Sequence, residues 1–266
     1  MPWTAFRELA RLVVPVECPG CGAADTPWCP ACAGWLAGPP TRVEAAVPRL
    51  DRLDGVAPLP VWALAGYEGA VRGVVVAWKD RGRADLDALL APAAGRAAAG
   101  LAPALAAAVG RRPLLVVPAP SSASARRARA RDHLHPVGRA IAAAVDGAYA
   151  PVLRRVRGSD QVGLGARARG GNVAVRVDLR ALARAAERMG RPGPPACLLL
   201  DDVVTTGATL AAVERSLEAA GADVLGAFVL AATPAPGDAG GRRRAASGRP
   251  ADRPAPRAPD SGVVEG

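Results

Sequence analysis

The stretch Cys197-Leu-Leu-Leu-Asp-Asp-Val-Val-Thr-Thr-Gly-Ala-Thr-Leu210 decides the fold class of this chain. Its first four residues, 197–200, are apolar, which is typical of a strand buried on both faces of a parallel sheet. Ligands of such sheets bind beyond the carboxyl ends of the strands, where Asp201 and Asp202 follow. The stretch therefore predicts an α/β protein with a binding site directly after this strand.

The loop at 205–209 predicts a site for an anion. Its backbone N–H groups and three hydroxyls would lie at the positive end of the following helix, where a phosphate binds well. Carboxylates do not bind a bare phosphate, so Asp201 and Asp202 require hydroxyls or Mg²⁺ beside it. A ribose 5-phosphate that carries a leaving group meets all these conditions. The alternative is an ordinary strand–turn–helix with a threonine cap and solvent-facing aspartates.

This ordered set resembles the 5-phosphoribosyl-1-pyrophosphate (PRPP) motif of the type I phosphoribosyltransferases. In that family two acidic residues follow a hydrophobic strand and precede a Thr-Gly-x-Thr loop. The resemblance implies that Asp201 and Asp202 are the catalytic pair and hold the ribose hydroxyls, directly or through Mg²⁺-bound water. It also implies a PRPP-binding segment made of Val203, Val204, Thr205, Thr206, Gly207, Ala208 and Thr209.

Two Cys-x-x-Cys units near the start of the chain, separated by seven residues, predict a metal site. Their thiols belong to Cys18, Cys21, Cys29 and Cys32. Two tight turns of this kind complete a tetrahedral Cys₄ zinc site, which would be structural because four thiolates close it. Trp28 and Trp35 could supply its small apolar core. The alternative is two disulfides, which need an oxidising compartment.

A short Cys₄ unit ahead of a PRPP-type motif is similar to the ComF/GntX family of phosphoribosyltransferase-like proteins. The resemblance covers roughly residues 14–232. It implies a type I phosphoribosyltransferase-like α/β fold, a mostly parallel central sheet flanked by helices, with a small N-terminal Cys₄ zinc ribbon. Further segments follow the family's order: Tyr67-Glu-Gly-Ala-Val-Arg72, Trp78-Lys-Asp-Arg-Gly-Arg83, Val116-Val-Pro-Ala-Pro120 and Gln161-Val-Gly-Leu164.

One segment departs from the family. Where the family has Gly-Phe-Asn-Gln, this chain has Arg131-Asp-His-Leu-His-Pro136. The PRPP side of the site is therefore present, while the acceptor side is not specified. His133 and His135 are the only histidines, and their spacing suits neither a helical metal pair nor a triad. We expect a structural or surface role for both.

Four basic residues are candidates for PRPP binding. Lys79, the only lysine, and Arg83 follow a predicted helix, where they either bind the ligand or complement the helix dipole. Arg126 and Arg127 begin a basic run after a predicted strand. They would meet the pyrophosphate of PRPP. Two alternatives for the run are a patch that contacts a nucleic-acid backbone and a solvated loop.

Three regions are expected: a lead-in, zinc ribbon and linker over 1–50, a phosphoribosyltransferase-like domain over 51–233, and a disordered tail over 234–266. A strand, a helix and a second strand at the motif predict a parallel crossover. Strands are predicted at 60–66, 114–117, 173–177, 197–200 and 224–230. Helices are predicted at 3–13, 71–78, 86–109, 137–145, 180–189 and 209–220, the third of them broken or kinked around Pro92 and Pro103.

Composition narrows the partners. The 266 residues carry a net charge of +10, which favours anionic ligands such as phosphates or nucleic acid. No run of 18 apolar residues and no signal-like start are found, so we expect a cytoplasmic protein without a membrane span. The ComF resemblance implies a link to DNA uptake, with single-stranded DNA or a helicase-type protein as partner. Three hypotheses stay open: an active transferase using PRPP and Mg²⁺, a non-catalytic PRPP-binding regulator, and a competence-type DNA accessory.

Overall fold

The structure of the chain is a computed structural model that describes residues 16–50, 58–120, 131–156 and 174–234. Contacts divide the chain into two units, Met1–Pro234 and Ala235–Gly266, and every described residue belongs to the first. The lead-in helix predicted over 3–13 and the tail predicted from 234 fall outside the described residues, apart from Pro234 itself.

A six-stranded sheet forms the centre of the first unit. Its order is β1 (Thr41–Arg42), β2 (Val61–Gly66), β8 (Asp223–Ala232), β7 (Ala196–Val204), β3 (Leu114–Pro118) and β4 (Ala148–Tyr149). Only β1 is antiparallel to its neighbour, so the sheet is mostly parallel. The predicted α/β class and the predicted strands at 60–66, 114–117, 197–200 and 224–230 are confirmed.

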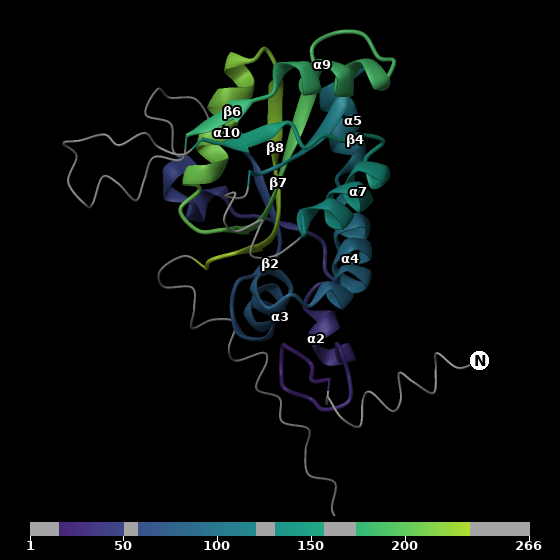
Figure 1. Ribbon diagram of the computed structural model, residues 1–266, viewed down its shortest axis with the longest axis vertical. Coiled ribbons are helices and arrows are strands. Elements are labelled where there is room, and N and C mark those ends of the chain that lie inside the picture. Colours follow the sequence, from purple (N-terminus) through teal and green to yellow (C-terminus); the bar gives the residue numbers. More distant parts are fainter. Residues whose placement is uncertain (1–15, 51–57, 121–130, 157–173, 235–266) are drawn as a thin grey trace, which may run out of the picture. The chain divides into compact units, whose positions relative to one another are not determined.

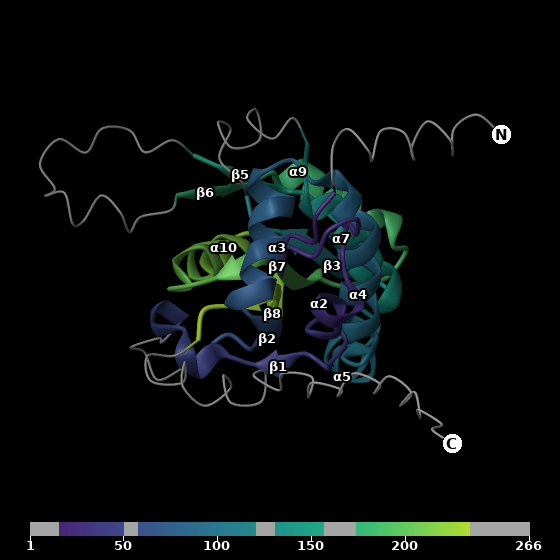
Figure 2. The same ribbon diagram turned by 90° about the horizontal axis from the view of Figure 1, so that it is seen from below.

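Helices cover both faces of the sheet, as Figures 1 and 2 show. Alternate residues of β7 point to opposite faces. The helices are α2 (Pro30–Gly34), α3 (Gly69–Asp80), α4 (Asp87–Ala99), α5 (Ala102–Val109), α7 (Leu134–Ala144), α9 (Leu179–Arg188) and α10 (Ala208–Ala219). In β7, Leu198 and Leu200 pack into a core shared with α4 and α7, whereas Cys197 and Leu199 pack into a second core shared with α9 and α10.

A two-stranded antiparallel hairpin lies beside the main sheet. It pairs β5 (Leu153–Arg155) with β6 (Val175–Val177), and β6 packs against α10. The strand predicted at 173–177 is confirmed for its described part. We did not predict β4 or β5, because strands of two or three residues are too short to show a period.

The helix predicted over 86–109 is not broken at Pro92. Pro92 lies inside α4, and the chain bends by 61° between α4 and α5, just before Pro103. Pro103 lies in the first turn of α5, where its missing N–H has no intrahelical partner to lose. Within the described residues, no single helix is long and apolar enough to cross a membrane, although α4 with its preceding turn and α5 reach that length and composition together.

The segment expected to be a linker is part of the folded unit. After β1, two short 3₁₀ helices, η1 (Glu44–Ala46) and η2 (Pro48–Leu50), continue the chain. Val47 and Leu50 are buried in the core on the α10 side of the sheet. The Glu44 carboxylate accepts a hydrogen bond from the backbone N–H of Val61 in β2, at 3.2 Å. These contacts join residues 41–50 to the central sheet.

Candidate functional site

The sheet has one topological switch point, between β3 and β7. From β3 the chain passes through α7 to β4 at one edge, whereas from β7 it passes through α10 to β8 on the other side. The two connections therefore leave in opposite directions, and ligands of open parallel sheets bind at such a point, beyond the carboxyl ends of the strands. Pro118, the last residue of β3, pairs with Leu200. Asp201 and Asp202 follow at this point.

The two aspartates lie inside β7, not after it as the sequence predicted. Because β8 continues beside β7, the pairing extends from Asp201, opposite Val229, to Val204, opposite Ala232. Successive side chains of a strand point to opposite faces, so Asp201 and Asp202 diverge. The backbone N–H of Asp202 donates to Asp201 Oδ1 at 2.8 Å.

Asp202 is paired on both carboxylate oxygens. Lys79 Nζ lies 2.7 Å from Asp202 Oδ1, and His133 Nε2 lies 2.8 Å from Asp202 Oδ2. Asp202 is 4% exposed and His133 is 1% exposed, so the second contact is shielded from water. Burial alone would raise the pKa of Asp202, but the hydrogen bond from His133 and the charge of Lys79 lower it below its ordinary value. Asp202 is therefore held as an anion.

Asp201 is in different surroundings. Burial, and next the negative charge of Asp202, raise the pKa of Asp201 to about 7. The backbone hydrogen bond from Asp202 and the charge of Lys79 oppose this rise without cancelling it. A carboxyl group with a pKa near neutrality ionises readily when a cation arrives. The pair thus combines one fixed anion with one group that can respond to a ligand.

Lys79 and His133 reach Asp202 from two helices. Lys79 lies in the last turn of α3, and His133 is the N-cap residue of α7. The alternative in which Lys79 only complements the helix dipole does not account for its ion pair with Asp202. His133 was not predicted as a site residue, and its contact with Asp202 corrects that omission. Lys79 is 123 residues from Asp202 in sequence, and His133 is 69 residues from it. Contacts over such separations cannot be predicted from local sequence patterns.

The loop after β7 has the form that the sequence predicts. Thr205 and Thr206 are exposed, and Gly207 adopts a left-handed conformation with φ of 79° before α10 begins. The helix predicted at 209–220 is confirmed, with its start and end each one residue earlier. The backbone N–H of Ala208 donates to Thr206 Oγ1 at 3.5 Å. Backbone N–H groups of a first helical turn lack intrahelical partners, so this turn, including Thr209, presents N–H groups toward the loop.

Not all predicted PRPP-binding residues come together. Val203 and Val204 pair with β8, and the Val204 side chain lies in the core. Arg83 donates to Asp85 Oδ2 at 2.7 Å and to the backbone oxygens of Glu17 and Pro27, each at 3.3 Å, so its contacts lead to the cysteine segment. Arg126 and Arg127 fall outside the described residues.

The four N-terminal cysteines form a candidate metal centre. The sulfur atoms of Cys18, Cys21, Cys29 and Cys32 all lie within 4.8 Å of one another. Around a tetrahedral zinc ion with bonds of about 2.3 Å, sulfur atoms are about 3.8 Å apart, so this spacing fits. Burial raises the pKa of the Cys18 thiol, but backbone N–H groups, chiefly that of Cys29, lower it overall to about 6.

The cysteine segment packs against α3. A Cβ atom added at Gly73 would lie 2.1 Å from the carbonyl oxygen of Pro19, so the backbone of the segment touches this helix directly. Trp28 is buried and joins the core on the α3 side, as predicted. The prediction for Trp35 is wrong, because its side chain is 51% exposed. Lys79 and the cysteine segment therefore share one supporting helix.

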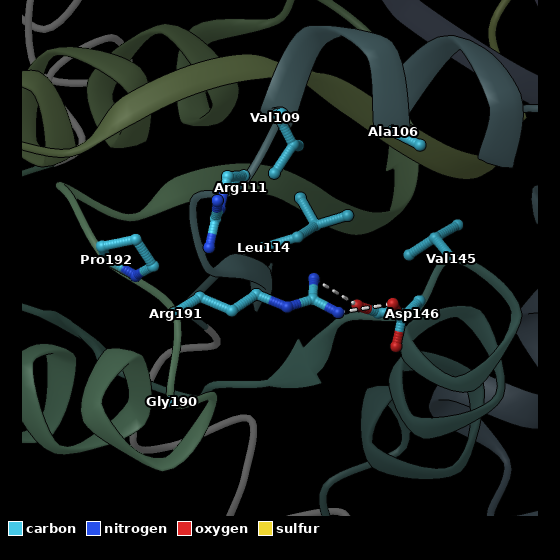
Figure 3. Close-up of a pocket in the computed structure, with 10 residues that line it drawn as sticks. Ala106, Val109, Arg111, Leu114, Val145, Asp146, Gly190, Arg191 and Pro192 are labelled. Atoms are coloured by element: carbon cyan, nitrogen blue, oxygen red, sulfur yellow. Dashed lines mark hydrogen bonds and ion pairs between the residues drawn. The ribbon is translucent and has the colours of Figure 1, made fainter.

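A hollow of about 380 Å³ lies at the opposite edge of the sheet (Figure 3). Leu114 begins β3 and Asp146 precedes β4, so this edge is the amino-terminal one. Arg191 pairs with Asp146 across the hollow. No residue of the predicted site lines it, and the switch point at Asp201 and Asp202 remains the candidate for chemistry.

Comparison with known proteins gives neither a family whose model matches the chain nor a match among curated proteins. The fold and site define an α/β protein with a mostly parallel sheet and two features: a carboxylate pair at the switch point and four cysteines that could hold a metal such as zinc.

Proposed function

We propose that this protein binds PRPP with Mg²⁺ and belongs with the phosphoribosyltransferases of the ComF type. The observation that carries the proposal is the order of groups at the switch point. Asp201 and Asp202 are followed by an exposed threonine loop, and this loop leads into the N-terminus of α10. This order supplies carboxylates for a diol and, after them, N–H groups for a phosphate.

Each part of the site has a role in the proposed reaction. The loop at 205–209 binds the 5-phosphate, and Asp201 and Asp202 bind the ribose hydroxyls. Mg²⁺, when bound, neutralises charge on the pyrophosphate as it leaves C1. The C1–oxygen bond to pyrophosphate breaks, and the acceptor forms a bond to C1 from the opposite face. The carboxylates stabilise the positive charge that develops on the ribose ring.

The partners of the Asp202 carboxylate fit a role in binding. Among the described residues, the side chains that pair with this carboxylate are those of Lys79 and His133, neither of which is needed as a covalent nucleophile. Transfer from PRPP depends on positioning and charge neutralisation, and the protein need not form a covalent intermediate. A regulator that binds PRPP without transfer would use the same site.

The test is a titration of the Mg²⁺-loaded protein with PRPP by isothermal calorimetry. The wild type should bind at one site per chain, and Asp202→Asn should weaken binding by roughly 10- to 100-fold because it removes the fixed anion. Glu187→Gln, an exposed change on α9, is the matched control and should bind as the wild type does. A wild-type protein that does not bind PRPP would refute the proposal. Release of pyrophosphate with a panel of bases then separates a transferase from a regulator.

For the cysteine site we propose zinc. Four thiols close together cannot all ionise without a cation, and four thiolates select zinc over harder metals. Cys18, Cys21, Cys29 and Cys32 would be its ligands, with the metal serving to hold the segment folded against α3.

A further inference from the structure

His133 is buried at the site and has no part in the proposed chemistry so far. Its side chain is among the few buried polar groups of the described residues, with Asp202 and Glu214. Burial of a polar ring is unfavourable unless the ring is hydrogen-bonded, and the partner here is Asp202 Oδ2 at 2.8 Å. The Asp202 carboxylate therefore compensates for the burial of the ring.

The ring of His133 is fixed by Trp78. The two rings meet edge to face, with centroids 4.7 Å apart and planes at 73°. Trp78 is itself fully buried, and its Nε1 donates to Asp87 Oδ1 at 2.6 Å. The support of His133 thus extends from α3 to the first residue of α4.

Arg131 closes the arrangement into a ring of contacts. Its guanidinium donates to Asp87 Oδ2 at 2.5 Å and to the backbone oxygen of Trp78 at 3.2 Å. Because Arg131 precedes His133 by two residues, the same hydrogen bonds that hold Trp78 also hold the chain that carries His133. Such a connected network keeps its members in one geometry.

The two partners of Asp202 differ in how easily they can leave. The Lys79 side chain is 29% exposed, whereas that of His133 is 2% exposed. A ligand or cation that approaches from solvent can replace a partly exposed ammonium group. It cannot replace a buried imidazole held by Trp78. Lys79 is thus an exchangeable counter-ion and His133 a permanent partner.

We propose that His133 is a positioning residue that holds the Asp202 carboxylate in the orientation needed to bind the ribose of PRPP. This inference rests on the proposed function of the site. His133 does not touch the ligand, and it acts through Asp202 by keeping one carboxylate oxygen engaged while the other exchanges Lys79 for the ligand. Loss of such a supporting hydrogen bond weakens binding by roughly 10- to 100-fold.

Three substitutions of His133 test the proposal by calorimetric titration with PRPP and Mg²⁺. His133→Gln places an amide N–H at a similar reach and should bind within about threefold of the wild type. His133→Asn carries the same group one methylene short, and His133→Leu fills the space without a donor. Both should lose roughly 10- to 100-fold. His135→Ala, an exposed neighbour on α7, is the control and should not change binding.

The outcomes separate this inference from the proposed function. If the wild type binds PRPP and the Asn and Leu variants bind equally well, His133 does not position Asp202. Equal losses in the Gln, Asn and Leu variants would also overturn the inference, since they would indicate a packing role. Failure of the wild type to bind PRPP overturns the proposed function, and this inference with it. Far-ultraviolet circular dichroism of each variant shows that it is folded, and the Gln–Asn pair suffices if the Leu variant unfolds.

Discussion

Asp201 and Asp202 are neighbours in sequence but differ in charge state. Asp202 accepts from Lys79 and His133, which holds its pKa below the ordinary value. Asp201 accepts from one backbone N–H, and burial together with the charge of Asp202 raises its pKa to about 7. The unliganded site therefore contains one carboxylate whose ionisation opposes folding. Binding of a cation would relieve this unfavourable interaction.

A pH-dependent gain in stability is expected for Asp201→Asn. In the unfolded chain an aspartate ionises near pH 3.9, whereas folded Asp201 holds its proton up to about pH 7. The folded state binds more protons in this window, so Asp201 lowers stability progressively as pH rises from about 4 to about 7. The asparagine removes this effect. Its stabilisation should be larger at pH 8 than at pH 5 by about 2–3 kcal/mol.

Urea unfolding of the unliganded wild type and variant at the two pH values measures this difference. Glu187→Gln on the exposed face of α9 provides a control in which an amide replaces a surface carboxylate. An equal effect of Asp201→Asn at pH 5 and pH 8 would show that Asp201 ionises normally in the folded protein.

At this scale the sequence predicted the residues of the motif but not their surroundings. Asp201, Asp202 and the left-handed Gly207 follow from local pattern, because strand, turn and helix signals are adjacent in the chain. His133 could not be predicted, since its role depends on a contact across 69 residues. Arg83 was assigned to the ligand by its position after a helix, and its ion pair with Asp85 leads elsewhere.

Among the elements, α3 connects the two candidate sites. The cysteine segment touches it at Gly73, and Lys79 reaches Asp202 from its last turn. Buried Val71, Val74 and Trp78 fix the same helix against the core. The helix was predicted from the spacing of these residues, but the position of the cysteine segment on it was not. The spacing of apolar residues within one element does not show which other element packs against it.

Metal analysis tests the cysteine site at this scale. The purified wild type should contain about one zinc per chain, and Cys18→Ser should contain almost none because three thiolates no longer close the tetrahedron. The variant should also unfold at lower urea concentration, since the segment loses its metal crosslink. Cys197→Ala, in buried β7, is the control and should keep its zinc. A folded wild type without metal would contradict the assignment.

Residues 47–50, which are distant in sequence from β7, pack against the loop that follows this strand. A Cβ atom at Gly207 would lie 2.4 Å from Val47 Cγ1 and 3.0 Å from Leu50 Cγ. These two residues come from the segment that the sequence predicted as a linker. It was predicted so because proline and glycine begin it and no period follows. The three-residue elements η1 and η2 form there through tertiary contacts.

Gly207→Ala should destabilise the protein more than Gly221→Ala. Both glycines have φ near 80°, so both changes introduce the same backbone strain, of about 1–2 kcal/mol. Only at Gly207 would the new Cβ also collide with Val47 and Leu50, which adds about 1–3 kcal/mol. Urea unfolding of the two variants measures the difference. Equal losses would mean that residues 47–50 do not pack on the loop.

The contact between residues 47–50 and Gly207 also affects how this chain can be recombined with others. A cysteine segment from another protein could be joined before β1 without removing any support of the loop. The sequence suggests a junction at residue 51, where the predicted domain begins. Such a junction would replace Val47 and Leu50, which pack against Gly207, together with the cysteine site. The segment that can be exchanged between proteins therefore ends before β1 and is shorter than residues 1–50.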